Sequence, residues 1–189
     1  GHKFHGPLGV AALWTKPGRE LEPFLVGGSQ ERRRRASTEN VPGIVGLGET
    51  CRLAAAELPE RERHLAELRD RFEAGLERIP DAVPHCTGSP RLPHTSHVAF
   101  LGLEGEALLI RLDLAGFAVS TGAACASGSV EPSPTLVAMG MERDEALASL
   151  RVSFGMPNTL EEVDRFLSTL EREVAELRRL TGRAAQVTA

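Results

Sequence analysis

The second half of the chain alternates segments with the apolar pattern of a strand and segments with that of a helix. Short runs rich in β-branched and aromatic residues are typical of strands, whereas apolar residues that recur every three or four positions are typical of helices. On this basis we predict strands at 96–103, 117–120 and 150–154, and helices at 104–114 and 136–139. This alternation indicates an α/β domain.

The last predicted helix has well-marked ends. Thr159 and Glu162 have the spacing of a capping box, in which each side chain accepts a hydrogen bond from the backbone N–H of the other residue. Gly182 is the residue type that commonly follows the end of a helix. Between them an apolar stripe recurs at helical spacing: Val163, Phe166, Leu167, Leu170, Val174, Leu177 and Leu180. The stripe predicts a helix with one side packed on a core.

The first half of the chain is less regular. Residues 10–15 form a short apolar run that predicts a buried strand, and residues 44–58, rich in Ala, Leu and Glu, predict a helix. Pro59 is expected to kink that helix or to start a new segment. A second amphipathic helix follows, with an apolar side formed by Leu65, Leu68, Phe72, Leu76 and Ile79. The stretch 80–93, rich in Pro, Gly and Ser, then predicts a loop.

Length and charge narrow the possible functions. A chain of 189 residues can form one ordinary domain or two small ones, and we place the boundary between residues 1–58 and 59–189. The net charge of −4 argues against a general nucleic-acid binder. No apolar run approaches the ~20 residues of a membrane-spanning helix, and the first residues lack the pattern of a signal peptide.

The cysteines, Cys51, Cys86 and Cys125, are odd in number and share no metal-ligand spacing. They predict free thiols in a reducing cytoplasm and no metal site. Cys51 falls in a predicted helix and is expected to be packed, whereas Cys86 lies in a predicted loop. Four histidines also share no spacing and are expected at the surface or in loops: His64, His85, His94 and His97.

Three side chains are candidates for chemistry. Lys3 precedes a Gly-Pro turn, and a lysine amine is the usual group that holds an aldehyde cofactor. Cys125 lies among Gly, Ala, Ser and Thr, which suits a thiol nucleophile on a flexible loop. Arg151 interrupts an apolar strand pattern, where a guanidinium could bind a carboxylate through two parallel hydrogen bonds. Each also has an ordinary interpretation: a surface lysine, a small packed thiol, or an edge-strand arginine in water.

Four segments together resemble the cysteine desulfurases of the longer-loop type, which are class-V-aminotransferase-like enzymes that use pyridoxal phosphate (PLP). The segments are His-Lys-Phe-His-Gly-Pro at 2–7, the Gly-Gly-Ser-Gln-Glu-Arg to Thr-Glu-Asn stretch at 27–40, Ser-Thr-Gly-Ala-Ala-Cys-Ala-Ser-Gly at 120–128, and Arg-Val-Ser-Phe-Gly at 151–155. The cysteine segment is the most specific, because a Glu-Pro-Ser follows it here as it does in that family. The resemblance runs over nearly the whole chain, with the segments in the order of the family.

The resemblance implies a role for each candidate residue. Lys3 would bind the PLP aldehyde, and His2 would bind the PLP phosphate. Thr38 would bind the phosphate of the neighbouring subunit in a homodimer. Arg151 would bind the α-carboxylate of the substrate, and Cys125 would accept its sulfur as a persulfide.

The loop that carries Thr38 departs from the family pattern. Arg33, Ala36 and Ser37 stand where the family prefers Gly, Ser and Gly. Four consecutive arginines at 32–35 could also indicate nucleic-acid binding, but in an acidic chain we interpret them as a solvated loop or an interface.

The implied architecture is the α/β fold-type I of PLP-dependent transferases. Residues 1–58 would supply the end of the large PLP domain, and residues 59–189 the small C-terminal α/β domain. The implied reaction removes sulfur from L-cysteine, gives L-alanine, and passes the sulfur to an iron–sulfur scaffold or another acceptor, in the cytoplasm and without a nucleic-acid or membrane partner. We expect the chain alone to be inactive, because the family's other cofactor-binding residues would precede Lys3. Two alternatives stay open: a selenocysteine lyase or related PLP lyase, and a non-catalytic module that docks a sulfur acceptor.

Overall fold

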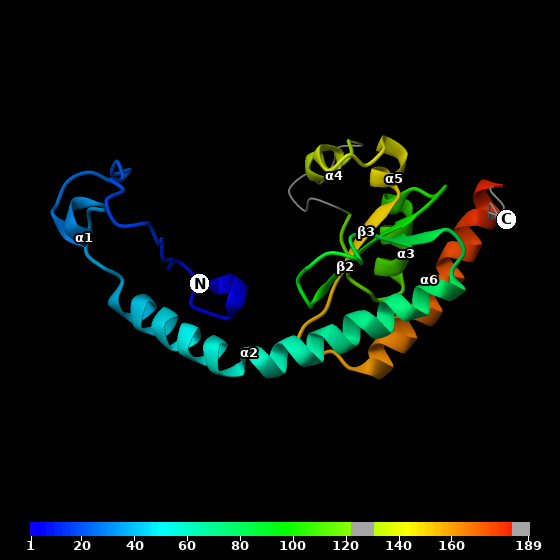
Figure 1. Cartoon of the computed structure of the whole chain (residues 1–189), viewed down its shortest axis with the longest axis horizontal. Coiled ribbons are helices and arrows are strands. Elements are labelled where there is room, and N and C mark those ends of the chain that lie inside the picture. Colours follow the sequence, from blue (N-terminus) through cyan, green and yellow to red (C-terminus); the bar gives the residue numbers. More distant parts are fainter. Residues whose placement is uncertain (122–130, 183–189) are drawn as a thin grey trace. The chain divides into compact units, whose positions relative to one another are not determined.

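The computed structural model describes residues 1–121 and 131–182, and these fall into two compact units, Gly1–Pro59 and Glu60–Ala189 (Figure 1). Helices and strands are mixed, which confirms the α/β prediction. Among the described helices, none is both long enough and apolar enough to cross a membrane.

The second unit is built on a three-stranded antiparallel sheet in the order β1-β2-β3. Its strands are β1 (Ala82–Pro84), β2 (Thr95–Phe100) and β3 (Ser149–Ser153). The register places His97 of β2 opposite Arg151 of β3. Because alternate residues of a strand point to opposite faces, this register decides which side chains share a face.

One face of the sheet carries the hydrophobic core. Helices α2 (Val41–Gly75), α3 (Gly105–Leu114) and α6 (Leu160–Thr181) pack against it, and α2 continues into the short 3₁₀ helix η2 (Leu76–Arg78). The fully buried centre of this core includes Leu68, Phe72, Val98, Leu108, Leu150 and Leu170. Figure 1 shows α2 and α6 side by side beneath the strands.

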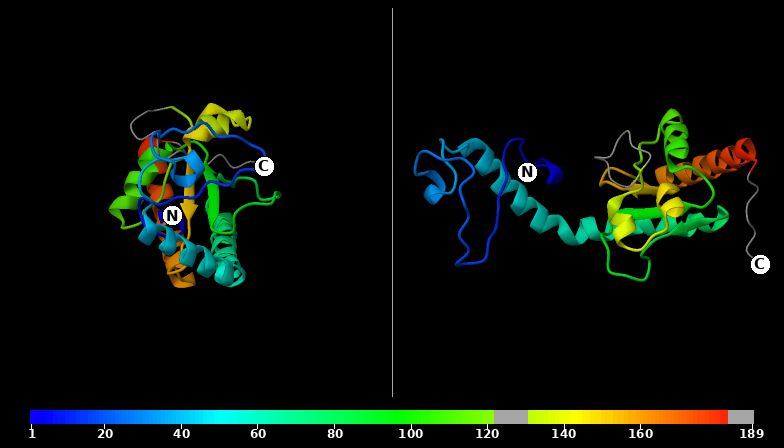
Figure 2. Two further views of the ribbon diagram at one scale, coloured as in Figure 1. Left: turned by 90° about the vertical axis from the view of Figure 1, so that its left-hand side faces the viewer. Right: turned by 90° about the horizontal axis from the view of Figure 1, so that it is seen from above.

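The opposite face of the sheet is covered by two short helices, α4 (Pro134–Ala138) and α5 (Arg143–Leu147). The right-hand view of Figure 2 looks onto this face, with α4 and α5 in front of the strands. Gly105 brings α3 close to the α5–β3 junction, because a Cβ there would lie 2.7 Å from the Leu147 carbonyl oxygen. The start of β3 is therefore held between helices on both sides.

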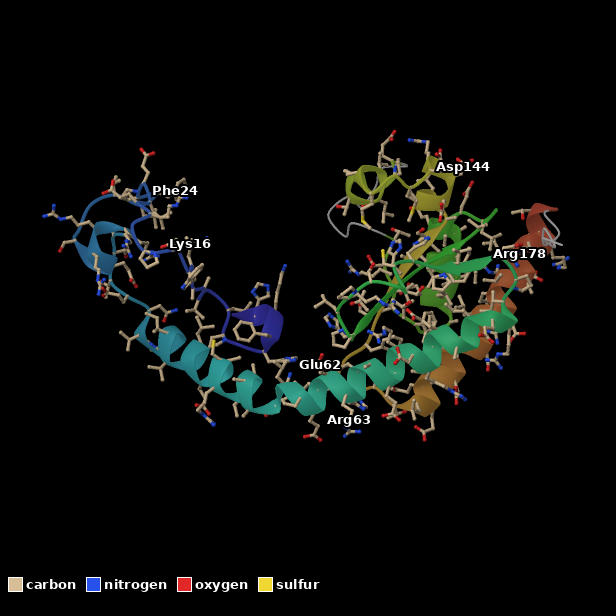
Figure 3. The ribbon with its side chains drawn as sticks, viewed as in Figure 1. Lys16, Phe24, Glu62, Arg63, Asp144 and Arg178 are labelled. Atoms are coloured by element: carbon tan, nitrogen blue, oxygen red, sulfur yellow. The ribbon has the colours of Figure 1, made fainter. Side chains whose placement is uncertain are left out.

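The capping box of α6 is confirmed. The backbone N–H of Glu162 donates to Thr159 Oγ1 at 3.2 Å, and the N–H of Thr159 donates to Glu162 Oε2 at 3.2 Å. Gly182 follows the helix with a left-handed φ of 65°. Arg178 near the end of α6 (Figure 3) donates to the Pro80 carbonyl oxygen at 2.7 Å. These contacts place α6 along the second unit as the sequence predicts.

Several predicted elements differ from the structure. The sequence predicts that Pro59 either kinks the helix or starts a new segment. The second outcome is wrong, because α2 runs through Pro59 without interruption. A proline removes one hydrogen bond of the helix, and the apolar residues of α2 that follow compensate by packing in the core. Within 117–120, only Ser120 makes a bridge, to Arg151. The predicted loop at 80–93 contains β1, which is too short to show a strand pattern.

The predicted strand at 10–15 is also wrong. These residues form no strand within the described part of the chain, and Leu13 and Trp14 are 77% and 78% exposed. A strand forms only where a neighbouring strand pairs with its backbone N–H and C=O groups. The first unit offers this run no such neighbour among its described residues. Phe24, also in the first unit, has a side chain that is 96% exposed (Figure 3).

Candidate functional site

The segment that carries Lys3 is a tight turn in the first unit. His2–Phe4 forms the 3₁₀ helix η1, and the backbone N–H of Gly6 donates to the Gly1 carbonyl oxygen at 2.9 Å. A Cβ on Gly6 would lie 2.8 Å from that oxygen, so the turn needs a glycine. The His2 and Lys3 side chains are exposed, and Lys3 makes no hydrogen bond or ion pair with any described residue. The amine is therefore sterically free to react with an aldehyde.

This turn is seated on α2 at a glycine. A Cβ on Gly46 would lie 2.6 Å from Pro7 Cγ, so the helix surface accepts the proline ring only because that Cβ is missing. This close contact between Pro7 and Gly46 fixes the position of the Lys3 turn against α2.

Thr38 is exposed on the loop between α1 (Gln30–Arg33) and α2. Its backbone surroundings are unusual, because Arg33 and Ser37 have φ angles of 63° and 85°. These are the two positions at which the resembled family prefers glycine. A left-handed conformation costs an L-residue about 1–2 kcal/mol relative to its right-handed one, so the loop keeps a glycine-type backbone without the glycines. No hydrogen bond joins Thr38 to His2 or Lys3 in the described structure.

Arg151 lies in the second unit, between two neighbours on the sheet. Its backbone pairs with His97 of β2 on one side and exchanges hydrogen bonds with Ser120 on the other, at 2.7 and 3.2 Å. Val152 and Leu150 on either side of it point into the core, so its side chain emerges on the opposite face of the sheet, as does that of His97. The ordinary interpretation, an edge-strand arginine in water, holds for the strand, because β3 is at the edge of the sheet, but not for the side chain, which is partly buried beside the Ser120 bridge.

Among the described residues Arg151 has no acidic partner, unlike three other half-buried or buried arginines of this unit. Arg91 pairs with Glu73 at 2.5 Å, Arg111 pairs with Glu173 at 2.7 Å, and Arg178 lies 3.5 Å from Asp81. In residues 1–121 and 131–182 no ion pair involves Arg151, although its side chain is partly buried. The segments 122–130 and 183–189 contain no Asp or Glu. A partly desolvated guanidinium without a counter-charge can bind an anion such as a carboxylate, which makes Arg151 a candidate for substrate binding.

Two histidines extend this site across the sheet. The Nδ1 atoms of His85 and His97 are 2.7 Å apart, and His85 Nε2 lies 3.0 Å from Glu145 Oε1 of α5. The prediction that these histidines lie at the surface or in loops is wrong for His97, which is on β2 and has a buried Nε2. His64 is also partly buried, with its Nε2 3.1 Å from the Asn158 carbonyl oxygen. Spacing along the chain does not reveal the histidine pair, because it depends on the pairing of β1 with β2.

The pKa of His97 is lowered to about 4. Burial is the main cause, since it disfavours the charged ring, and His85 and the Arg151 cation lower it further. His97 is therefore neutral at neutral pH. His97 therefore adds no charge beside the Arg151 cation at neutral pH.

This shift predicts an acid-sensitive contribution to stability. Between pH 6.5 and about 4 the unfolded chain binds a proton on His97 that the folded chain does not, so the free energy of unfolding falls as the pH falls in that window. Allowing for solvent screening of a partly exposed ring, we expect a loss of about 1–2 kcal/mol. Urea unfolding of wild type and His97→Asn at pH 7.5 and 4.5 checks this. The variant should lose less stability than wild type, and equal losses would contradict the prediction.

The predicted nucleophile, Cys125, lies outside the described residues. Cys51 and Cys86 are free and exposed. The expectation that Cys51 is packed is wrong, since it lies on a solvent-facing side of α2. Exposure is therefore common to both described thiols and does not by itself indicate a catalytic role. Among the described residues no group of three His, Cys, Asp or Glu side chains is placed to bind a metal ion.

A groove of about 320 Å³ lies between residues 116–119, the end of β3 and the start of α6. The Arg165 guanidinium lies over the Phe117 ring, 5.6 Å from its centroid, and Glu162 and Asn158 also line the groove. Sequence patterns give no sign of this groove, since its walls come from three separate segments.

Comparisons with known proteins identify relatives of this chain. A protein named cysteine desulfurase IscS from Methanosarcina thermophila is 48% identical over 183 residues, which cover 96% of this chain and 45% of that protein. A cysteine desulfurase from Gluconacetobacter diazotrophicus is 46% identical over 182 residues, 96% of this chain and 46% of that protein. The chain thus spans about half the length of the curated relatives it matches.

Solved structures agree with these relatives. A NifS-like protein superimposes with a TM-score of 0.80 at 36% identity, over 93% of this chain and 45% of that one. The NifS-like protein from Rickettsia africae has a TM-score of 0.74 at 28% identity, over 83% of this chain and 41% of that one. The model of the aminotransferase class-V family matches residues 1–166. The chain therefore belongs to the aminotransferase class-V family.

Proposed function

We propose that this chain is the C-terminal part of a PLP-dependent cysteine desulfurase, which converts L-cysteine to L-alanine and keeps the sulfur as a protein persulfide. The observation that carries this proposal is the 48% identity to a cysteine desulfurase over 96% of the chain. The uncompensated guanidinium of Arg151 supports it, since an amino-acid substrate brings a carboxylate.

The chain's donor groups fit PLP. Lys3 has an exposed amine without a partner in the described part, His2 adjoins it on η1, and Thr38 has an exposed hydroxyl. Lys3 would hold the aldehyde, and His2 and Thr38 would donate to the phosphate, Thr38 to that of the second subunit of a homodimer. When bound, PLP supplies an electron sink for bond cleavage at the substrate's carbon atoms.

Arg151 and Cys125 would act on the substrate. Arg151 would hold the α-carboxylate with both arms of its guanidinium and so fix the orientation of L-cysteine. The Cys125 thiolate would bond to the substrate sulfur while the bond between that sulfur and Cβ breaks. The electron pair of the broken bond stays with carbon, which takes up a proton, and the products are L-alanine and a persulfide on Cys125.

The two units would have different tasks. Residues 1–58 would complete the large PLP domain, and residues 59–189 would form the small domain that presents Cys125. Exposed apolar side chains of the first unit, such as Leu13, Trp14 and Phe24, are consistent with a surface that the rest of the large domain covers. The persulfide would pass to an iron–sulfur scaffold or another sulfur acceptor in a reducing, cytoplasmic environment.

A chimera tests the proposal. The N-terminal half of the Methanosarcina thermophila relative, joined ahead of Gly1, should bind PLP with a visible absorption band and release L-alanine from L-cysteine in the presence of a thiol reductant. The matched Lys3→Ala chimera should lose the lysine adduct that borohydride traps, and the 189-residue chain alone should release no alanine. A chimera that binds PLP but acts only on L-selenocysteine, or on neither amino acid, would refute the desulfurase assignment.

A further inference from the structure

A row of four polar side chains crosses one face of the sheet in the second unit. Glu145 of α5 contacts His85, His85 contacts His97, and His97 lies opposite Arg151. The backbone N–H of His85 donates to the His97 carbonyl oxygen at 2.8 Å, so β1 and β2 hold the two rings in register. The ring centroids are 5.0 Å apart. The row thus has an acid at one end, a cation at the other, and two imidazoles between them.

The hydrogen bonds assign a proton position to each ring. His85 Nε2 faces a carboxylate oxygen and therefore carries a hydrogen, and we assign the Nδ1 atom of His85 as the acceptor toward His97. His97 Nδ1, 2.7 Å away, must then be the donor. His97 Nε2 is left as a buried lone pair without a partner among the described residues. The opposite assignment would bury an N–H donor there, and orphaned buried N–H groups are the rarer case.

The two histidines lie between the Glu145 carboxylate and the Arg151 guanidinium, two opposite charges that attract each other. Glu145 is the acid of α5 that faces the row, and its carboxylate is engaged by His85. Arg151 keeps its charge without an ion pair in the described structure, although pairing is the rule for the comparable arginines at 91, 111 and 178. An arginine that pairs with an internal carboxylate would have to break that pair before it bound a substrate carboxylate.

We propose that His97 and His85 are positioning residues that act as a spacer between Glu145 and Arg151, engaging Glu145 so that Arg151 stays unpaired for the carboxylate of the substrate. This inference rests on the proposed function for the identity of that carboxylate. The spacer itself is a property of this chain, and it can be measured on the chain without cofactor or substrate.

Nitrogen NMR on the 189-residue chain at pH 7 provides the test. Long-range ¹H–¹⁵N spectra should show a neutral His97 ring with its hydrogen on Nδ1, and a hydrogen on Nε2 of His85. Exchange of the Arg151 Nε–H with solvent should show no protection by a carboxylate. His97→Asn, which keeps a neutral donor, should leave the Arg151 signal unchanged. His97→Asp, which places a carboxylate opposite Arg151, should slow its exchange at least about tenfold.

His64→Asp is the matched control, because it makes the same exchange at a partly buried histidine on α2. It should not alter the Arg151 signal. A charged His97 ring at pH 7, or a wild-type Arg151 Nε–H already protected by a carboxylate, would overturn the inference even if His97→Asp failed to fold. Failure of the desulfurase proposal would appear elsewhere, as a wild-type chimera without turnover of L-cysteine.

Discussion

Replacing Cys125 by Ser is expected to stop the release of alanine and sulfide from L-cysteine while PLP binding and folding survive. Serine is close in size to cysteine, but its hydroxyl is a far weaker nucleophile at neutral pH than a thiolate. Removal of a covalent nucleophile typically costs several orders of magnitude, so we expect a rate loss of roughly a thousandfold or more. The assay is alanine formation in the chimera that carries this chain.

The other two thiols supply the controls for Cys125. Cys51 and Cys86 are both exposed and free, so either could take up sulfur without a catalytic role. Cys51→Ser and Cys86→Ser should each keep the wild-type rate. After incubation with L-cysteine, mass spectrometry should find one added sulfur atom on the peptide containing Cys125. A Cys125→Ser protein that formed alanine at the wild-type rate would contradict the assignment.

Local sequence signals predict part of this structure well. The capping box of Thr159 and Glu162 and the apolar stripe behind it predict α6, because both signals lie within a few helical turns. The same kind of reasoning fails at residues 10–15, since a strand depends on pairing partners that a local pattern cannot supply. Periodicity thus predicts helices here better than it predicts strands.

The candidate site also contains one residue that the sequence pattern reveals and others that it does not. Arg151 is conspicuous in the sequence because a charge interrupts an apolar alternation. His85, His97 and Glu145 are not, because β-sheet register and the packing of α5 bring them together from positions far apart in the chain. The left-handed backbone at Arg33 and Ser37 is also invisible to propensity arguments, which would place glycine there.

Arg151→Leu is expected to weaken the use of L-cysteine by roughly 30-fold to several thousandfold in kcat/KM. Loss of a partly buried, two-pronged contact to a carboxylate costs about 2–5 kcal/mol, and each 1.4 kcal/mol is a factor of ten. Arg151→Lys keeps the charge but loses the planar fork, so it should recover only part of the activity. Arg179→Leu is the matched control, because it removes an arginine from an exposed ion pair with Glu176 on α6, which contributes at most about 1 kcal/mol to stability.

A substrate without a carboxylate separates recognition from damage to the fold. Cysteamine has the amine and thiol of L-cysteine but no α-carboxylate, so Arg151 can contribute nothing to its binding. If Arg151 recognises the carboxylate, Arg151→Leu should lower kcat/KM for L-cysteine and leave any turnover of cysteamine unchanged. The ratio of kcat/KM for L-cysteine to that for cysteamine should therefore fall. A general disturbance of β3 would instead reduce both. Full activity of Arg151→Leu toward L-cysteine, or an equal loss for both compounds, would remove Arg151 from the substrate site and leave its unpaired charge beside His97 without a ligand to explain it.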